Sequence, residues 1–344
     1  MSSIKASLPA LLGVMLAMHS SGQEPTFRSQ SNVVFVPALV KDEAGNPVYG
    51  LEARDFLIRD DGIEQRARLD EASESEPVFL MLALQRGRRA SREFARVRGL
   101  GSMLGPVFAH PGSQVALVEF DSTVLFLRDF TPDLSAIAGD LQQLHPGDGG
   151  AAILDAVQFS LRMLDRTPAG YRKVLLLISE TRDHGSHLAK LEDVVTSLGN
   201  GNTVVYALPF SPALSQMLDT ERGSNQDEWG STPNLLAPLV MATQAMRKNT
   251  PKAIAGMTGG EYQVFASRQG FENDMTSFTN HLHSRYVLSF EPQNPHPGLH
   301  QIRVQMREPG KRVVLARRSY WAERNPPQPS SGDRVLRQAR YSSA

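Results

Sequence analysis

The chain has 344 residues, of which 41% are hydrophobic and 21% charged, so it has enough apolar material for a core. Lysine plus arginine and aspartate plus glutamate both number 36, and this balance argues against non-specific nucleic-acid binding as the main function. Cysteine is absent, which excludes disulfides, thiol catalysis and cysteine metal sites. The length suggests two compact units with flanking segments.

Residues 1–22 have the pattern of a signal peptide. Lys5 supplies a weak positive start, Ala6–Met18 is a short apolar stretch, and Ser20, Ser21 and Gly22 offer small residues for cleavage. The stretch is too short to span a bilayer comfortably, and a buried N-terminal helix is the alternative. We therefore expect an exported protein, periplasmic or extracellular, with no membrane span after cleavage and with a linker at residues 23–31.

Residues 32–70 are typical of a small antiparallel β module. Short β-rich pieces at 32–40, 48–51 and 56–58 are separated by turns rich in Gly, Asn, Asp and Pro. Leu51–Phe56 is expected to form a single helical turn that packs Leu51 and Phe56 inward. An acidic stretch at residues 71–76 then marks a boundary.

Residues 77–284 are predicted to form an α/β unit. Continuous apolar runs at 78–84, 114–120 and 173–179 indicate parallel strands that are buried on both faces. The segment 123–130 is expected to be an antiparallel edge strand. Further elements are predicted as helices at 91–108, 134–144, 153–164, 187–198, 234–247, 251–257 and 271–284 and strands at 203–208 and 262–265. Asp133 is the expected N-cap of the second helix, and Gly99, Gly101 and Gly105 should weaken the first.

The C-terminal part returns to β structure. Strands at 286–290, 300–306 and 312–317 are expected to complete the N-terminal module or to form a small terminal sheet within residues 285–322. His296 and His300 flank Pro297 and Gly298 and are expected in a surface loop. The segment Pro209–Thr232 is predicted to be disordered or a partner-facing loop, and residues 323–344 are predicted to form a disordered tail.

This order of elements resembles a von Willebrand factor type A domain, and more narrowly the exported VWFA-related domain proteins of acidobacteria. The resemblance runs from Asn32 to Ala322 and rests on many weak positions in order. Among them are Val36-Pro37, Asp55-Phe56, Asp61-Gly62, Arg285-Tyr286, Ile302-Arg-Val304 and Arg317-Arg318-Ser-Tyr320. It implies a doubly wound, mostly parallel α/β sheet with helices on both faces, beside the small β module.

The resemblance also implies a metal-ion-dependent adhesion site at the carboxyl ends of the strands. In the family, Asp-x-Ser-x-Ser on one loop, a Thr on a second and an Asp on a third hold a divalent cation such as Mg²⁺. The corresponding positions here are Gln85, Gly87, Arg89, Ala151 and Glu180. Only Glu180 keeps a carboxylate, and Arg89 would repel a metal ion. We therefore expect no bound metal, with Mg²⁺ or Ca²⁺ as the alternative.

A cluster of arginines lies on and beside the first of these loops: Arg86, Arg88, Arg89 and Arg92. Arg89 or Arg86 is expected to pair with Glu180 and to hold the loops together as the ion would. The remaining arginines, with Asp183, are candidates for binding an acidic partner, because guanidinium groups favour carboxylates. The alternative is a solvated basic loop without a ligand.

A second carboxylate and imidazole set lies after the strand at 173–179. Asp183, His184 and His187, with Asp148, Asp155 and Glu180, would make an alternative metal site, whereas helix capping by Ser186 or Asp183 would leave exposed histidines. The motifs G-x-S-x-G, G-x-x-x-x-G-K-[ST] and H-E-x-x-H are absent. We therefore expect no enzymatic activity.

These patterns together predict an exported bacterial adhesion or scaffolding module that binds a protein partner through the carboxyl ends of its central strands. One alternative is a purely structural envelope protein that has lost ligand binding. Another is a metal-dependent or hydrolytic enzyme that uses Glu180, Asp183 and His184.

Overall fold

The computed structural model describes residues 33–70, 76–87, 89–210, 237–293, 296–308 and 310–323. The predicted signal peptide, the linker at 23–31, Arg88 and nearly all of the predicted tail lie outside the described residues. So does the segment 211–232, which is most of the predicted partner-facing loop. Among the described residues, no helix combines the length and the apolar character that crossing a membrane requires.

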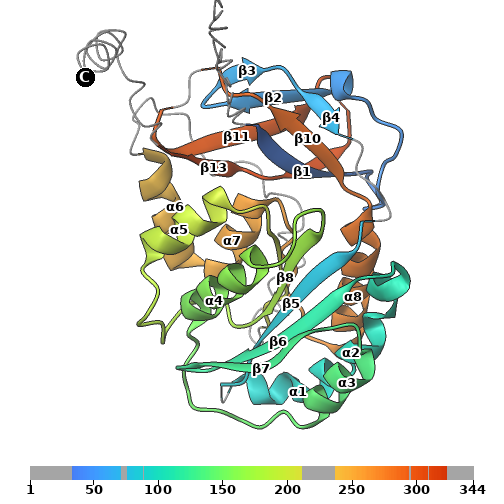
Figure 1. Ribbon diagram of the computed structural model, residues 1–344, viewed down its shortest axis with the longest axis vertical. Helices are drawn as coiled ribbons and strands as arrows, with labels where there is room; N and C mark the ends of the chain where they lie inside the picture. Colours follow the sequence, from blue (N-terminus) through green and yellow to red (C-terminus); the bar gives the residue numbers. More distant parts are fainter. Residues whose placement is uncertain are drawn as a thin grey trace, which may run out of the picture. The chain divides into compact units, whose positions relative to one another are not determined.

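A five-stranded sheet forms the centre of the α/β unit (Figure 1). Its order is β7 (Val124–Thr131), β6 (Gln114–Phe120), β5 (Val78–Gln85), β8 (Arg172–Ile178) and β9 (Val204–Ala207). The strands β6, β5, β8 and β9 are parallel, and β7 is the antiparallel edge strand. All eight residues of β5 are buried, which explains the unbroken apolar run in its sequence. The sheet is thus mixed and mostly parallel.

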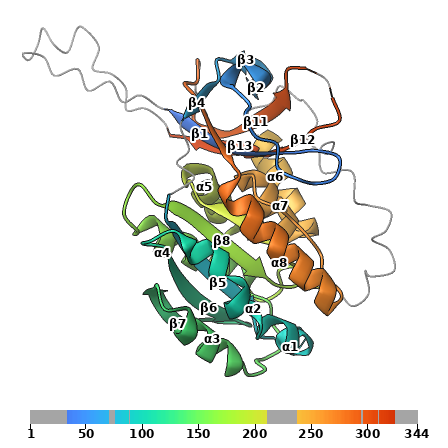
Figure 2. The ribbon, with the colours of Figure 1, turned by 90° about the vertical axis from the view of Figure 1, so that its right-hand side faces the viewer.

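Helices cover both faces of this sheet (Figures 1 and 2). One face packs against α1 (Phe94–Val97), α2 (Leu100–Met103), α3 (Leu134–Gln142) and α8 (Arg268–His283), and the other against α4 (Ile153–Asp165), α5 (Leu191–Asn200), α6 (Ala237–Lys248) and α7 (Thr250–Thr258). Alternate residues of β5 belong to the two buried clusters: Leu80 faces one side and Met81 the other.

The local predictions were partly wrong. The expected helix at 91–108 is broken into η2 (Ala90–Glu93), α1, α2 and η3 (Gly105–Ala109), in keeping with its three interior glycines. Helix α5 begins at Leu191 rather than His187, because the intervening backbone turns onto the side chain of Asp155. The segment 262–265 makes only isolated parallel bridges. By contrast, Asp133 caps α3 as predicted, accepting hydrogen bonds from the N–H groups of Ser135 and Ala136.

Two four-stranded antiparallel sheets stand beside the α/β unit (Figure 1). One has the order β12 (Val313–Ala316), β1 (Val34–Lys41), β10 (Tyr286–Phe290) and β4 (Arg68–Asp70); the other has β13 (Ser319–Ala322), β11 (Gly298–Met306), β2 (Phe56–Asp60) and β3 (Ile63–Gln65). Each sheet combines N-terminal and C-terminal strands, so the C-terminal segments do complete the N-terminal module. Buried side chains of both sheets share one cluster, which includes Phe56 and Leu288.

Within this module the helical turn and most strands were predicted, and two elements were not. The turn η1 (Ala53–Asp55) lies between Leu51 and Phe56, whose side chains are buried. The expected strand at 48–51 is absent, and only Pro47 makes a bridge, to Lys41. The strand β13 was missed.

The β module packs on the α/β unit through buried polar contacts. Arg317, which is buried, donates to the carbonyls of Leu198 and Gly199 in the last turn of α5. A Cβ on Gly199 would lie 2.9 Å from the Trp321 Cβ, so β13 lies directly against this turn. Glu261, also buried, joins Lys41 of β1 to His281 of α8, with nitrogen–oxygen distances of 3.1 and 2.8 Å.

Candidate functional site

The candidate site lies at the carboxyl ends of the central strands, beside the point where the strand order reverses. The chain runs from β5 to β6 on one side and later returns to place β8 on the other side of β5. Open α/β sheets bind their ligands at such a point. We call the loops 85–89, 120–123, 146–151 and 179–190 the strand-end face. Backbone hydrogen bonds join these loops, for example from the Arg86 N–H to the Phe120 carbonyl at 2.7 Å.

Gln85 occupies the centre of this face and is only 4% exposed. Its side-chain oxygen accepts from the Glu180 N–H at 2.7 Å, and its Nε2 donates to Glu180 Oε1 at 3.1 Å. The same Nε2 lies 3.4 Å from the Gly150 carbonyl oxygen. One amide therefore ties the loop after β5 to the loop after β8 and to the loop before α4. The polar capacity of Gln85 is used within the chain.

Two glycines allow these loops to pack closely. A Cβ on Gly87 would lie 2.6 Å from the Gly150 carbonyl oxygen, and one on Gly150 would lie 2.1 Å from Ser122 Oγ. The backbone could not keep these positions if either residue carried a side chain. A serine hydroxyl at position 87 therefore has no room.

The five positions that the resemblance assigned to a metal ion do not fit one. The oxygen of Gln85 is taken by a backbone N–H, Gly87 and the buried Ala151 offer no hydroxyl, and Arg89 brings a positive charge. Glu180 supplies the one carboxylate of the set. Hard divalent cations need several oxygen ligands, and this donor set does not provide them.

The Glu180 carboxylate, 13% exposed, is shared among three side chains. Besides Gln85, its Oε2 lies 3.3 Å from an Arg89 guanidinium nitrogen and 3.1 Å from His184 Nε2. The Arg89 side chain is 78% exposed, so this ion pair lies at the surface and adds little stability. The expectation that an arginine pairs with Glu180 holds for Arg89.

Arg86 turns the other way and contacts Asp121, at 2.9 Å between guanidinium nitrogen and carboxylate oxygen. The Asp121 side chain is 4% exposed and Arg86 is 25% exposed. The other oxygen of Asp121 accepts from the N–H and hydroxyl of Thr123. Burial raises the pKa of the neighbouring Glu119 carboxyl, and the charge of Arg86 opposes that rise. Pairing of Arg86 with Glu180 was therefore the wrong alternative, because a buried carboxylate lies closer.

Arg92 is the remaining described arginine of the predicted cluster, and it is exposed in η2. Asp183, proposed from sequence as a partner contact, instead caps α4. Its Oδ1 accepts from the Leu154 N–H at 3.0 Å and from the Ser186 hydroxyl at 2.6 Å. Asp183 is thus engaged inside the chain, at the start of α4 and not at the following helix α5, which begins after Lys190.

The second carboxylate and imidazole set (Asp148, Asp155, Glu180, Asp183, His184 and His187) does not form a common site. Asp148 accepts from the N–H groups of Gly150 and Ser122, and these bonds hold the pKa of its carboxyl below the ordinary value. His187 is 61% exposed and its Nδ1 lies near the Gly185 carbonyl. Within the described residues, the set places no three of its ligand atoms within 4.8 Å of one another.

Asp155 is a structural residue of the face whose role was not predicted. It is 4% exposed and accepts from the N–H groups of His187, Leu188 and Ala189, at 3.1, 3.1 and 2.6 Å. These bonds turn residues 187–189 away from helical geometry and fix the loop after β8. A signal was available in the sequence, because Asp155 is the one polar residue among the apolar residues 153–157 at the start of α4.

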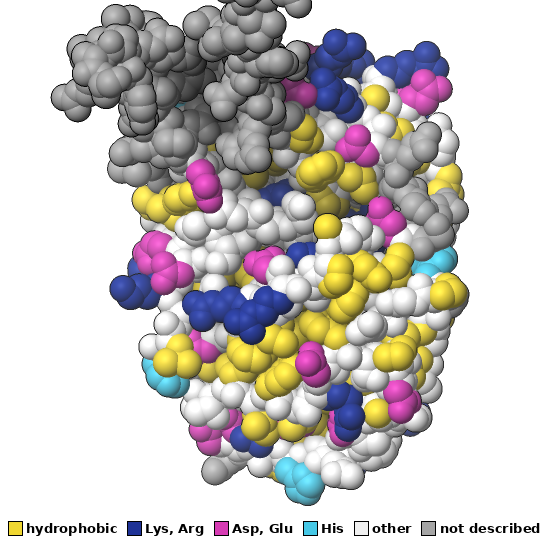
Figure 3. Space-filling model, in the orientation of Figure 1, with side chains coloured by type: hydrophobic (Ala, Val, Ile, Leu, Met, Phe, Trp, Pro, Cys, Tyr) yellow, Lys and Arg dark blue, Asp and Glu magenta, His cyan; other side chains and the backbone are white. Residues whose placement is uncertain are grey.

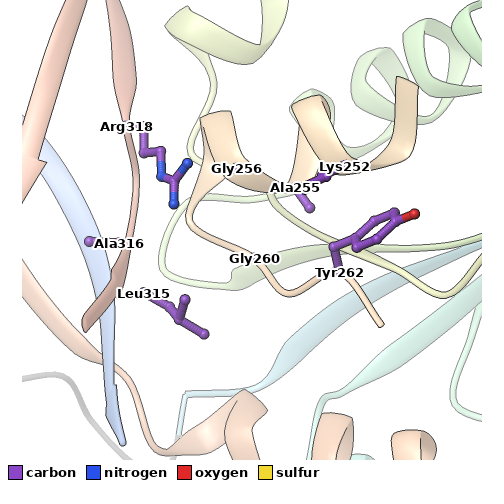
Figure 4. Close-up of a pocket in the computed structure, with 8 residues that line it drawn as sticks. All are labelled: Lys252, Ala255, Gly256, Gly260, Tyr262, Leu315, Ala316 and Arg318. Atoms are coloured by element: carbon purple, nitrogen blue, oxygen red, sulfur yellow. The ribbon is translucent and has the colours of Figure 1, made fainter. Parts of the chain in front are cut away.

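Two further surface features lie outside this face. A pocket between α7 and β12 is lined by Lys252, Ala255, Gly256, Gly260, Tyr262, Leu315, Ala316 and Arg318 (Figure 4). Burial lowers the pKa of Arg318 there. The edge strand β7 exposes Leu125, Phe126 and Leu127 at 42%, 38% and 38%. Figure 3 shows basic and acidic side chains interspersed with hydrophobic ones over the face that it displays.

Comparison with known proteins gives a family for the central part of the chain. Residues 82–183, from within β5 to Asp183, match the family model of the von Willebrand factor type A domain. No curated protein matches the chain.

Among solved structures, the chain is similar to a von Willebrand factor type A protein from Catenulispora acidiphila, with 11% identity, 86% of this chain and 76% of that chain covered, and a TM-score of 0.44. It is also similar to the pilus adhesin SpaC from Lactobacillus rhamnosus GG, with 10% identity, 83% of this chain and 49% of that chain covered, and a TM-score of 0.39. A third similar structure is the von Willebrand factor domain of the type V pili tip protein Mfa5 from Porphyromonas gingivalis. Its identity is 17%, 32% of this chain and 39% of that chain are covered, and the TM-score is 0.29. This chain spans about two fifths of the Mfa5 structure.

Proposed function

We propose that this chain, a protein with a von Willebrand factor type A domain, is an exported binding or adhesion module that captures an acidic protein partner on its strand-end face without a metal ion. The signal-peptide pattern of residues 1–22 and the resemblance to exported acidobacterial proteins support export. The degenerate metal-site positions and the arginines beside them support the mode of binding.

The observation that carries the proposal is the set of hydrogen bonds made by Gln85. In a metal-dependent site, a cation links the loops after the first and later strands and leaves one position for a partner carboxylate. Here the Gln85 amide links the same loops, through both the backbone and the side chain of Glu180. The loops are therefore held in place without an ion.

A partner carboxylate would meet guanidinium groups on this face. Arg89 stands over Glu180 with most of its side chain in solvent, and Arg92 is exposed on the next turn. Arginine binds carboxylates in a bidentate manner. Because the Arg89–Glu180 pair is solvent-exposed, exchanging Glu180 for a carboxylate on the partner costs little. Arg89 and Arg92 are thus the residues that we assign to partner contact.

In this proposal Glu180, Asp183 and His184 have structural roles and the chain is not an enzyme. Asp183 caps α4, so it does not orient His184 as a general base would require. His184 contacts Glu180 and pairs through its backbone with Ala151. The contacts of these three residues hold loops together.

Binding to a defined acidic polymer tests the proposal. The full chain, treated with EDTA, would be titrated with poly-L-glutamate, and the affinity compared with that of an Arg89→Ala/Arg92→Ala variant. A matched control is Arg162→Ala/Arg166→Ala, which removes two exposed arginines at the opposite end of α4. We expect binding in EDTA that weakens as salt is raised, about tenfold weaker binding by the Arg89/Arg92 variant, and unchanged binding by the control.

Three outcomes would overturn the proposal. Binding that requires Mg²⁺ would show that an ion is part of the site. Equal binding by the Arg89/Arg92 variant and the wild type, or no binding by either, would favour a structural envelope protein without a ligand at this face.

A further inference from the structure

A group of ligand atoms suited to a metal ion lies in the β module, outside the strand-end loops. Asp61, His296 and His300 each place one carboxylate oxygen or ring nitrogen in this group, with all three atoms within 4.8 Å of one another. Asp61 Oδ2 lies 2.8 Å from His300 Nδ1 and 3.2 Å from His296 Nε2. In the described residues this is the one group of three such side chains.

Strand pairing brings these residues together although they are distant in sequence. Asp61 and Gly62 form the two-residue turn between β2 and β3, with φ angles of 47° and 87°. Strand β11 pairs with β2 so that Ile302 lies opposite Asp60. His300, two residues earlier on β11, therefore falls beside the turn. His300 was predicted to lie in a surface loop, and this was wrong: its side chain is 1% exposed in β11.

Hydrogen bonds fix the orientation of the His300 ring. Its Nε2 lies 2.7 Å from the His296 carbonyl oxygen, an acceptor, so Nε2 carries a proton. Nδ1 lies 2.8 Å from Asp61 Oδ2, an acceptor, so without a metal it donates there, and a metal ion would take the place of this proton. Metal-bound histidines in proteins are held in this way, with the second ring nitrogen donating to a carbonyl. His300 is thus oriented as a metal ligand.

Neighbouring side chains support this arrangement. Asp60 Oδ1 lies 3.3 Å from the same His300 Nδ1, and Asp60 Oδ2 accepts from the Tyr320 hydroxyl at 2.8 Å. The His300 ring stacks between His296 and Tyr320, at centroid distances of 4.0 and 4.6 Å. Two stacked imidazoles would repel each other if both were protonated. A cation shared between them lets both rings stay neutral and balances the two carboxylates.

We propose that Asp61, His296 and His300 bind a zinc ion, with Asp60 or a water molecule as the fourth ligand. Zinc takes imidazole nitrogen and carboxylate oxygen in tetrahedral sites at about 2.0–2.2 Å, which places ligand atoms about 3.3 Å apart. The distances of 2.8 and 3.2 Å around Asp61 Oδ2 are close to that spacing. Small side-chain shifts would complete the site.

The ligand set selects zinc over Mg²⁺ and Ca²⁺, the alternative cations considered for the strand-end face. Imidazole nitrogen suits zinc, whereas Mg²⁺ and Ca²⁺ prefer oxygen. The side chains of Asp61 and His296 are 30% and 28% exposed, so an ion can enter from solvent. A bound ion would join segments about 240 residues apart in a chain that has no cysteine for a disulfide. We therefore assign it the role of a structural link in the β module.

Zinc binding by the full chain tests this site. The protein would be prepared without a polyhistidine tag, stripped with EDTA, dialysed, and titrated with zinc by calorimetry and with Co²⁺ as a visible-absorption probe. The variants are Asp61→Asn, which tolerates the left-handed turn, and His296→Gln. The control is His187→Gln, an exposed histidine on the strand-end face.

We expect one zinc per chain, a Co²⁺ spectrum of tetrahedral intensity, and affinity lowered at least about tenfold in both variants. The control should bind as the wild type does, and excess Mg²⁺ should not compete. Circular dichroism in EDTA checks that the variants remain folded. The proposal is overturned if the wild type takes up no zinc, if both folded variants bind it as the wild type does, or if the control loses it.

Discussion

The strand-end face and the Asp61–His296–His300 cluster contain the same kinds of side chain, arranged in opposite ways. On the strand-end face the carboxylates of Asp155 and Asp183 accept hydrogen bonds from backbone N–H groups. In the cluster the ligand atoms face one another within 4.8 Å. Carboxylates and histidines that lie near each other in sequence are therefore not sufficient for a metal site. Whether such side chains can bind a metal ion depends on where their lone pairs point once the backbone N–H donors have found their acceptors.

The largest loss of stability is expected from a substitution of Asp155 on the strand-end face. Replacing Asp155 by Ala leaves the N–H groups of His187, Leu188 and Ala189 without their acceptor, so we expect the free energy of unfolding to fall by about 4 kcal/mol. Chemical denaturation measures the loss. The control is Asp165→Ala at the end of the same helix, where the side chain is 53% exposed. A loss no larger than that of the control would mean that Asp155 does not hold the loop.

A second test concerns a carboxylate held by cations. Burial alone would raise the pKa of the Glu261 carboxyl, but its hydrogen bond with His281 and the charges of Lys41 and Arg285 lower the pKa from 4.5 to about 2. Because the folded-state pKa is depressed, this stability is present above about pH 4.5 and is lost as pH falls towards 2. The loss should reach about 3 kcal/mol.

Denaturation curves between pH 7 and pH 2 would measure the contribution of Glu261. A Glu261→Gln variant should lack this part of the pH dependence, whereas Glu43→Gln, at an exposed pair, should keep it. Parallel acid curves for Glu261→Gln and the wild type would contradict the assignment.

The role of the Gln85 amide can be tested with an isosteric change. Gln85→Glu places a second carboxylate about 3 Å from that of Glu180. Since two carboxylates at this distance cannot both ionise, we expect a loss of about 2 kcal/mol at pH 7 that shrinks at pH 5. Gln143→Glu, at an exposed position, is the control. Mg²⁺ should not restore the stability, because Gly87 and Ala151 supply no hydroxyl; recovery with Mg²⁺ would show that an ion can replace the amide.

The smallest effect on stability is expected at Arg89. Arg86→Ala leaves the buried Asp121 carboxylate without its cation and should cost about 1.5 kcal/mol. Arg89→Ala removes an exposed ion pair and should change the free energy of unfolding by less than about 0.5 kcal/mol. Thermal denaturation of the two variants compares neighbouring arginines of one loop. Equal losses would contradict the division between a structural Arg86 and a partner-facing Arg89.

The sequence predicted the central sheet well, because β5 and its neighbours are buried on both faces and therefore read as continuous apolar runs. It did not predict β13, since Ser319–Ala322 is too short to show a period. The start of α5 was placed too early because the bonds from residues 187–189 to Asp155 are tertiary contacts that no local pattern reveals.

The candidate site was predicted in outline only. The position of Gln85 beside Glu180 followed from the resemblance, but the choice of Arg86 between Glu180 and Asp121 depends on side-chain directions that spacing does not encode. The burial of His300 was missed because Pro297 and Gly298 indicate a turn, whereas β11 already begins at Gly298.

The most direct test of where this chain holds an ion, and where it does not, is anomalous X-ray diffraction from crystals soaked in zinc and in manganese, which stands in for magnesium. We predict one zinc peak bounded by Asp61, His296 and His300, and no metal density between Gln85 and Glu180. A metal ion bridging Gln85 and Glu180, or an empty Asp61–His296–His300 cluster after the soak, would contradict the account.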